Sequence, residues 1–261
     1  MKKVLLFDLD GTLCLSRKNI PEKLVKILSQ HNKYAEIGIV TGSDIDFVKE
    51  QCEGLFKGLP HTNKVYAFAC NGTKAFKIRK GEHDVLYDLI SQEDIREKLG
   101  EDKFNKLFQK MIQLQNVVCK LDIPLTGNFI TCRDSTINWC PIGRGANDDD
   151  RAKFKKLDHT TNLRKNFLAK LTRFIKKHDI GVEANIAGDT SFDIYPPEWD
   201  KTYVLPYFKD YDIMFWGDRC MPTGNDYTIS LALGDRCIWV KDPEETYRSL
   251  KYYLASNSHT T

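Results

Sequence analysis

Apolar runs of strand length alternate with amphipathic segments through the first third of the chain. The runs cover residues 3–9, 36–40 and 65–69. Each is followed by a turn dipeptide, of which Asp10-Gly11 is the first. Residues 21–30 and 44–52 lie between the runs and repeat apolar side chains at helical spacing. This alternation predicts a parallel sheet with helices on its faces.

The pattern changes in the middle of the chain. A long helical stretch is expected over residues 92–117, and further helices over 147–154 and 162–178. Two strand pairs are expected within residues 127–144 and 181–196, each around a polar turn. Helices beside antiparallel hairpins indicate a separate α+β unit.

The strand and helix alternation returns near the end of the chain. Strands are expected over residues 212–218 and 236–240, and Asp242 caps a final helix. We therefore predict an α/β core domain of residues 1–84 and 200–261. An α+β domain of residues 85–199 is inserted into it.

Composition narrows the class of protein without identifying it. The chain has 261 residues, of which 41% are hydrophobic and 29% charged, as is usual for a soluble globular protein. A net charge of +3 is too small to indicate a nucleic-acid partner, and no apolar run approaches the length of a membrane span. The eight cysteines lack zinc-type spacing, and no export signal is present. We therefore expect a cytoplasmic location with reduced thiols.

Polar side chains gather where the strands of the α/β part end, which is where open α/β sheets bind ligands. These residues are Asp8, Asp10, Ser43, Lys201, Asp218 and Asp226. Carboxylates at one point repel each other unless a cation lies among them, and oxygen ligands suit Mg²⁺. We expect Asp8, Asp10, Asp218 and Asp226 to hold the metal. A carboxylate oxygen that is free of the metal can act as a nucleophile, while Ser43 and Lys201 suit a phosphate.

Four motifs in this order resemble the haloacid-dehalogenase superfamily of phosphotransferases. They are DLDGT (8–12), TGS (41–43), the lone Lys201 and GDRCMPTGND (217–226). The segments RDSTINWCPIGR, DDDRAKF and DTSFDIYPPEWDK extend the resemblance to eukaryotic phosphomannomutases, from Val4 to about Ser249. The resemblance implies a Rossmann-like core and an inserted α+β cap. It also implies that Asp8 becomes an aspartyl phosphate and that Asp10 is the general acid/base.

The resemblance assigns substrate binding to one residue of the core and five of the inserted domain. These are Arg17, Arg133, Arg144, Arg151, Ser191 and Asp193. The residue types agree with this role, because the planar guanidinium binds phosphate through two parallel hydrogen bonds. Ser191 and Asp193 alternate on an expected strand, so both face one side and suit sugar hydroxyls.

The leading hypothesis is a Mg²⁺-dependent phosphomannomutase that interconverts mannose 6-phosphate and mannose 1-phosphate. A hexose 1,6-bisphosphate would be its intermediate and activator, and the product would supply GDP-mannose synthesis. The main argument is that a mutase needs two phosphate sites, whereas a phosphatase needs one. A sugar-phosphate phosphatase of the same superfamily is the alternative, and a catalytically silent scaffold is a third hypothesis. The resemblance also implies a homodimer through the inserted domain.

Two positions depart from the family pattern. Ala232 stands where an acid of a second cation site is expected, so Asp235 replaces that acid or the second site is absent. Thr41 stands where the family often has glycine, and threonine is common in the wider superfamily. The preference between mannose and glucose phosphates stays open.

Overall fold

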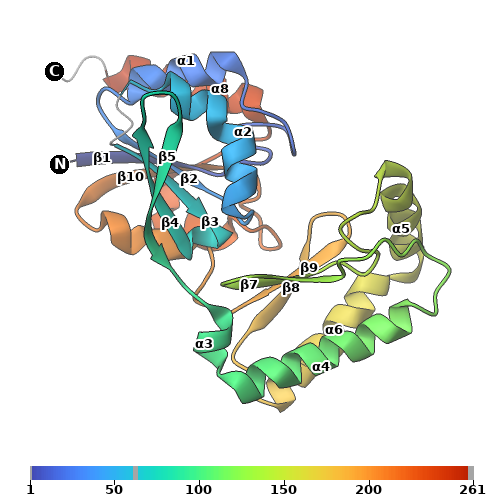
Figure 1. Cartoon of the computed structure of the whole chain (residues 1–261). Coiled ribbons are helices and arrows are strands. Elements are labelled where there is room, and N and C mark those ends of the chain that lie inside the picture. The colour runs from blue at the N-terminus through green and yellow to red at the C-terminus, as the bar shows by residue number, and fades with distance from the viewer. Residues whose placement is uncertain (1, 61–63, 258–261) are drawn as a thin grey trace. The chain divides into compact units, whose positions relative to one another are not determined.

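The computed structural model of the protein describes residues 2–60 and 64–257. The chain divides into two compact units. Unit 1 comprises Met1–Gln92 and Glu198–Thr261, and unit 2 comprises Glu93–Pro197. Figure 1 labels the helices and strands of both units.

Unit 1 is built on a seven-stranded sheet in the order β11-β10-β1-β2-β3-β4-β5. Its strands are β1 (Lys2–Phe7), β2 (Glu36–Val40), β3 (Val65–Ala69), β4 (Lys74–Lys80), β5 (Val85–Gln92), β10 (Tyr211–Gly217) and β11 (Cys237–Trp239). The strands from β11 to β3 pair in parallel, and β4 and β5 add an antiparallel hairpin. The predicted α/β class with a parallel sheet is confirmed.

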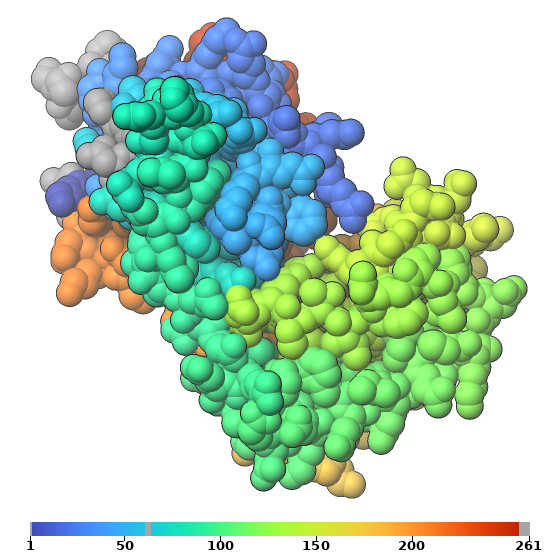
Figure 2. All heavy atoms as spheres, viewed as in Figure 1, coloured from blue at the N-terminus to red at the C-terminus, as the bar shows by residue number. Residues whose placement is uncertain are grey.

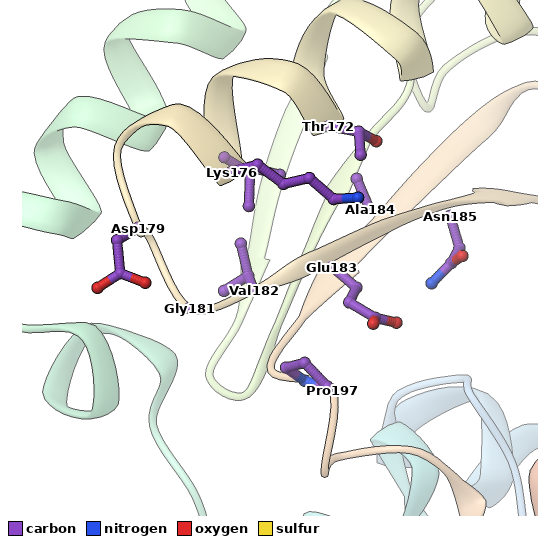
Figure 3. Close-up of a pocket in the computed structure, with 10 residues that line it drawn as sticks. Thr172, Lys176, Asp179, Gly181, Val182, Glu183, Ala184, Asn185 and Pro197 are labelled. Carbon is purple, nitrogen blue, oxygen red and sulfur yellow. The ribbon is translucent and has the colours of Figure 1, made fainter.

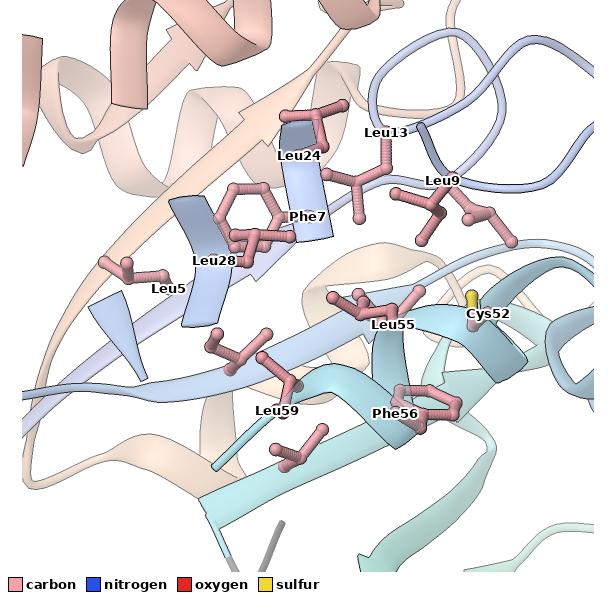
Figure 4. Close-up of a cluster of buried hydrophobic side chains, with 14 of the residues drawn as sticks. Leu5, Phe7, Leu9, Leu13, Leu24, Leu28, Cys52, Leu55, Phe56 and Leu59 are labelled. Carbon is pink, nitrogen blue, oxygen red and sulfur yellow. The ribbon is translucent and has the colours of Figure 1, made fainter. Parts of the chain in front are cut away.

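Both faces of this sheet are covered, because side chains of β1 alternate between two apolar clusters. Leu5 and Phe7 pack with the first group of helices, and Val4 and Leu6 pack with the second (Figure 4 shows the first cluster). The first group is α1 (Glu22–His31), α2 (Ile45–Gly58) and α8 (Pro243–Asn257). The second is the 3₁₀ helix η3 (Lys201–Phe208) and helix α7 (Tyr227–Leu233). The short turns η2 (Cys70–Gly72) and η4 (Gly234–Arg236) follow β3 and α7.

The β4–β5 hairpin is the part of unit 1 that the sequence analysis missed. Residues 85–92 were assigned to the inserted domain, but Val85–Gln92 forms strand β5 and pairs with β4. As the edge strand, β5 leaves Leu86, Leu89 and Ile90 exposed, so it lacks the clean alternation of a half-buried strand. Figure 2 shows the hairpin as part of the surface of unit 1. The boundary of unit 2 therefore falls at Glu93, and its end falls at Pro197.

Unit 2 contains a four-stranded antiparallel sheet in the order β6-β7-β9-β8. Its strands are β6 (Ile130–Arg133), β7 (Thr136–Trp139), β8 (Glu183–Ala187) and β9 (Ser191–Tyr195). Its helices are α3 (Ile95–Leu99), α4 (Glu101–Val118), α5 (Asp148–Thr161) and α6 (Leu163–Lys177). The two predicted strand pairs and the α+β character are confirmed.

Local chemistry explains where the helices of unit 2 begin and break. The helix expected over residues 92–117 is divided at Gly100, whose φ of 72° is outside the helical range. Asn147 and Asp150 form a reciprocal capping box at the start of α5.

The core of unit 2 includes Trp139, whose ring stacks on that of Phe192 with 4.7 Å between the ring centroids. Within the described residues, no helix combines the length and apolar content that crossing a bilayer requires.

His31 makes the stability of unit 1 dependent on pH. Its side chain is buried, and Nε2 lies 3.1 Å from the Leu250 carbonyl oxygen of α8. Burial lowers the pKa of His31 from 6.5, although the hydrogen bond to Leu250 opposes this shift. Below pH 6.5 the unfolded chain therefore binds the proton more readily than the folded chain, and stability falls with decreasing pH.

We expect the free energy of unfolding to decrease below about pH 6.5, by at most about 1.4 kcal/mol per pH unit from this one group. His31→Gln retains a hydrogen-bond donor but does not titrate, so its urea unfolding should depend less on pH. His83→Gln changes an exposed histidine and serves as the control. Equal pH dependence in His31→Gln and the parent chain would remove His31 from this role.

Candidate active site

A single buried ammonium group joins three segments of unit 1 that are distant in sequence. Lys201 opens η3, Asp8 follows β1, and Asp226 precedes α7. Lys201 Nζ donates hydrogen bonds to Asp8 Oδ1 and, over 2.6 Å, to Asp226 Oδ1. Lys201 and Asp226 are 0% exposed and Asp8 is 3% exposed. The predicted meeting of these three residues at one edge of the sheet is therefore present in the fold.

Asp218 completes an oxygen-rich group beside this lysine. Asp8, Asp218 and Asp226 each offer a carboxylate oxygen, and these oxygens lie within 4.8 Å of one another. Asp218 Oδ1 is buried and has no hydrogen-bond partner within the described part of the chain. A side chain at Gly11 would collide with Asp218 Oδ2, and φ of Gly11 is +94°. Convergent carboxylate oxygens with an unsatisfied buried member fit Mg²⁺.

Burial sets the charge balance of this group. Burial raises the pKa of Asp8, the charge of Lys201 opposes the shift, and the charges of Asp226 and Asp218 add to it. The pKa of Asp218 is also raised, by burial and by the charge of Asp226. Burial alone would lower the pKa of Lys201, but the charges of Asp226 and Asp8 outweigh it and raise the pKa. Three carboxyls therefore share the single cation of Lys201, and the ionised forms of Asp8 and Asp218 are disfavoured. A bound metal ion would favour these ionised forms.

Ser43 lies just before helix α2. Its backbone N–H donates to Thr41 Oγ1 over 3.1 Å, and its carbonyl accepts from the N–H of Cys70 over 2.9 Å. Asp44 caps the helix by accepting from the N–H of Ile45. The threonine at position 41, a departure from the family pattern, therefore supports the turn that carries Ser43. The helix N-terminus behind Ser43 favours an anion.

Asp10 lies outside the three-carboxylate group. Its Oδ1 accepts hydrogen bonds from Gln51 Nε2 over 3.0 Å and from the backbone N–H of Arg17 over 3.4 Å. The expected participation of the Asp10 side chain in the metal group is therefore not seen among the carboxylates that the structure brings together. Arg17 itself adopts a left-handed conformation with φ of 60°.

Unit 2 has a charged group of its own around Asp193 on β9. Asn138 of β7 donates from Nδ2 to Asp193 Oδ1 over 2.7 Å, and Arg144 Nη1 donates to Asn138 Oδ1 over 3.4 Å. Burial raises the pKa of Asp193, and the charges of Arg133 and Arg144 oppose the shift. Arg133, Arg144 and Asp193 are thus close enough to interact.

The other two predicted residues of unit 2 are less directly connected to this group. Ser191 is buried on β9, two positions before Asp193, and so lies on the same face of the strand. Arg151 lies in the first turn of α5. Within the residues that the structure describes, no hydrogen bond links the Arg151 side chain to Asp193 or its partners.

A pocket of about 500 Å³ lies elsewhere in unit 2, between the end of α6 and strand β8 (Figure 3). Lys176, Asp179 and Glu183 are among its lining residues. The predicted substrate-binding residues do not line it. The pocket therefore adds no support to their assignment.

Sequence reasoning missed two amide side chains that touch predicted site residues, Gln51 and Asn138. Asn138 is one of four consecutive buried residues of β7, where apolar side chains are expected. Gln51 is 4% exposed on α2, a helix whose other buried residues are apolar. A polar residue at an otherwise apolar, buried position was the available signal in both cases.

The mostly parallel sheet with aspartates after β1 and β10 agrees with the haloacid-dehalogenase fold expected from the motifs, and solved structures of similar fold support this class. An IMP-nucleotidase of Plasmodium falciparum aligns with a TM-score of 0.68 at 17% identity, covering 98% of this chain and 67% of that chain. A trehalose-6-phosphate phosphatase related protein aligns with a TM-score of 0.52 at 15% identity, covering 99% and 100%. These similarities concern the fold alone.

Sequence comparisons identify the family. Residues 24–256 match eukaryotic phosphomannomutase. Phosphomannomutases of Arabidopsis thaliana and Encephalitozoon cuniculi are each 35% identical over 257 residues, covering 97% of this chain and 97% and 94% of theirs. The phosphomannomutase of Dendrobium officinale is 34% identical over 258 residues, covering 98% of this chain and 96% of its own. The chain belongs to the eukaryotic phosphomannomutase family, which confirms the resemblance predicted from its motifs.

Removal of the buried ammonium should destabilise unit 1. We expect Lys201→Met to lower the free energy of unfolding by about 3–5 kcal/mol in EDTA, because Asp8 and Asp226 would lose their buried partner. Mg²⁺ should restore part of this loss, because a bound cation would replace the missing charge. Urea unfolding with and without Mg²⁺ measures both effects.

Lys209→Met changes an exposed lysine just after η3 and is the matched control. A Lys201→Met chain as stable as this control, in EDTA, would show that the lysine does not compensate buried charge.

Proposed function

We propose that the chain is a phosphomannomutase that interconverts mannose 6-phosphate and mannose 1-phosphate. Family membership supports an enzyme of this class. The observation that carries the proposal is the presence of two chemically distinct groups, the Asp8–Lys201 group in unit 1 and the Arg144–Asp193 group in unit 2. A phosphatase needs only the first group, so the phosphatase alternative has less support.

Asp8 is the proposed nucleophile. Its Oδ2 attacks the phosphorus of a hexose 1,6-bisphosphate, and the bond from phosphorus to the sugar oxygen breaks as the aspartyl phosphate forms. Lys201 binds Asp8 Oδ1 and supplies positive charge beside the transferring group, and Ser43 supplies a hydrogen-bond donor. Mg²⁺, held by Asp8, Asp218 and Asp226, would neutralise charge on the phosphoryl oxygens when bound.

Asp10 is the proposed general acid/base. As an acid it gives its proton to the departing sugar oxygen, and as a base it takes the proton of the sugar hydroxyl that later accepts the phosphoryl group. The aspartyl phosphate passes its phosphoryl group to the free hydroxyl of a hexose monophosphate, which frees Asp8 and forms the bisphosphate. The bisphosphate then turns end for end before Asp8 takes its other phosphate. Net, a phosphate moves from one carbon of the sugar to the other and the bisphosphate is regenerated, which is why a hexose 1,6-bisphosphate would act as activator.

Unit 2 is proposed to bind the phosphate that is not being transferred. Arg133, Arg144 and Arg151 provide guanidinium groups for that phosphate, and Ser191 and Asp193 suit sugar hydroxyls. Arg17 is the proposed contribution of unit 1 to substrate binding. On this proposal unit 1 is the catalytic domain and unit 2 the substrate-binding cap.

The location, the pathway and the oligomeric state are proposed from the same family relationship. We propose a cytoplasmic enzyme whose product supplies GDP-mannose synthesis, and a homodimer formed through unit 2. A second cation site is not part of the proposal. Ala232 and Asp235 are both exposed, and the group of converging carboxylates among the described residues does not include Asp235. A silent scaffold is disfavoured because Asp8, Lys201 and Asp226 remain assembled at buried positions.

A coupled assay tests the mutase activity. With Mg²⁺ and catalytic hexose 1,6-bisphosphate, mannose 1-phosphate should be converted to mannose 6-phosphate with little release of inorganic phosphate. Asp8→Asn should abolish turnover, because an amide is a poor nucleophile and metal ligand, while its thermal unfolding shows a folded chain. Stoichiometric release of phosphate would favour the phosphatase, and full activity of Asp8→Asn would exclude Asp8 as nucleophile.

Arg144→Ala tests the second phosphate site. Loss of a charge-assisted hydrogen bond to phosphate should lower kcat/KM for mannose 1-phosphate by roughly ten- to hundred-fold. Hydrolysis of acetyl phosphate, which has no second phosphate, should be nearly unchanged. An equal loss of both activities would assign Arg144 to the fold or to the catalytic phosphate.

A further inference from the structure

We propose that Gln51 is a positioning residue for Asp10. Its side-chain amide donates one hydrogen bond to an oxygen of the Asp10 carboxylate and another to the segment that follows Arg17. The other carboxylate oxygen of Asp10 can then exchange a proton with the sugar. The inference rests on the proposed function, because it takes Asp10 as the general acid/base.

Gln51 lies at the centre of a small hydrogen-bonded network. Its Nε2 lies 3.0 Å from Asp10 Oδ1 and 3.4 Å from the carbonyl oxygen of Lys18. The backbone carbonyl of Gln51 accepts from the N–H of Ile20 over 3.3 Å. Nε2 also lies 3.4 Å from Cys14 Sγ, so one residue of α2 contacts the loop that carries Asp10 at four separate points.

The surroundings define which end of the amide faces Asp10. A carboxylate oxygen and a carbonyl oxygen both lie within hydrogen-bond distance of Nε2, and both can only accept. The amide oxygen in the same place would face two acceptors and be repelled. The NH₂ group therefore points towards Asp10 and Lys18, and each of its two hydrogens has an oxygen to bind.

The two oxygens of Asp10 are held differently. Oδ1 accepts from Gln51 and from the backbone N–H of Arg17, whose left-handed φ of 60° places it there. No hydrogen bond to Oδ2 occurs within the part of the chain that the structure describes. Two donors on one oxygen fix the plane of the carboxylate and leave the second oxygen for proton transfer.

A purely structural role is the simpler explanation for a buried amide, and the position argues against it. The other buried residues of α2 are Val48, Cys52, Leu55 and Phe56. An apolar residue would pack at position 51 without desolvating an amide. The amide is useful at this position because it contacts a carboxylate whose orientation matters.

Variation of the leaving group separates a positioning role from a structural one. Release of a sugar oxygen needs a proton from Asp10, whereas acetyl phosphate has a good leaving group and needs none. We measure kcat for mannose 1-phosphate and the single-turnover rate at which acetyl phosphate phosphorylates Asp8. Gln51→Met, which is close in volume, should lower the first by roughly ten- to hundred-fold and leave the second nearly unchanged. KM should change little, because substrate binding does not use Gln51.

Two further variants complete the design. Gln51→Glu replaces the donor with an acceptor of equal size and should slow sugar transfer at least as much as Gln51→Met. Gln51→Glu replaces Gln51→Met as the test variant if the methionine variant does not fold. Leu55→Ala is the matched control, because it weakens packing of the same helix one turn away without touching Asp10. It should lower the melting temperature without any dependence on the leaving group.

Three results would overturn the proposal. They are an equal loss with both substrates in Gln51→Met, no loss with either substrate, or the same leaving-group dependence in Leu55→Ala. Failure of the proposed function is distinguishable. If the parent chain releases phosphate from mannose 1-phosphate without isomerising it, the mutase assignment fails. In that case, the rate of phosphate release from mannose 1-phosphate replaces the isomerisation rate. Its comparison with the acetyl phosphate rate in Gln51→Met still tests the role of Gln51.

Discussion

The buried ion pair of Lys201 with Asp8 and Asp226 is the constraint on which unit 1 depends. A buried ion without a partner costs several kcal/mol, so the end of β1, the start of η3 and the start of α7 must come together for any of them to be stable. The same pairing places the proposed nucleophile Asp8, the proposed phosphate ligand Lys201 and potential metal ligands within a few ångströms of one another. Stability and chemistry are therefore provided by the same charges.

Local sequence signals were sufficient for much of the fold and for the main group of charges. Strands β1, β2 and β3 are apolar runs that end in turn residues, and parallel strands bring such ends to one edge of the sheet. That rule applies to Asp8 and Ser43, which follow β1 and β2, whereas Lys201 opens η3 and follows no strand of this sheet. The β4–β5 hairpin was not predicted, because β5 is an edge strand with exposed leucines and lacks a clear alternation of apolar and polar residues. The break at Gly100 was hidden because the helical pattern continues on both sides.

The roles of Gln51 and Asn138 could not be predicted from the sequence, for a different reason. Gln51 and Asn138 each lie in a segment whose neighbours are buried, and nothing in the segment says which distant group the amide contacts. Their roles follow from tertiary contacts with Asp10 and Asp193. Both amides donate to the carboxylate of a predicted site residue. Each unit thus places a neutral hydrogen-bond donor against the carboxylate of a predicted site residue, which adds no charge to that group.

The discontinuity of unit 1 has a consequence for the order of events during synthesis. Strand β1 pairs with β10 in a register that joins Lys2 to Tyr211, whereas the residues of unit 2 form one continuous segment. On the ribosome, the inserted unit can therefore complete its fold while β1 still lacks one neighbour and Asp8 has no counter-ion. Phosphotransfer chemistry becomes available only after the last third of the chain emerges. A product that ended before Lys201 would contain all of unit 2 but would lack the proposed catalytic lysine.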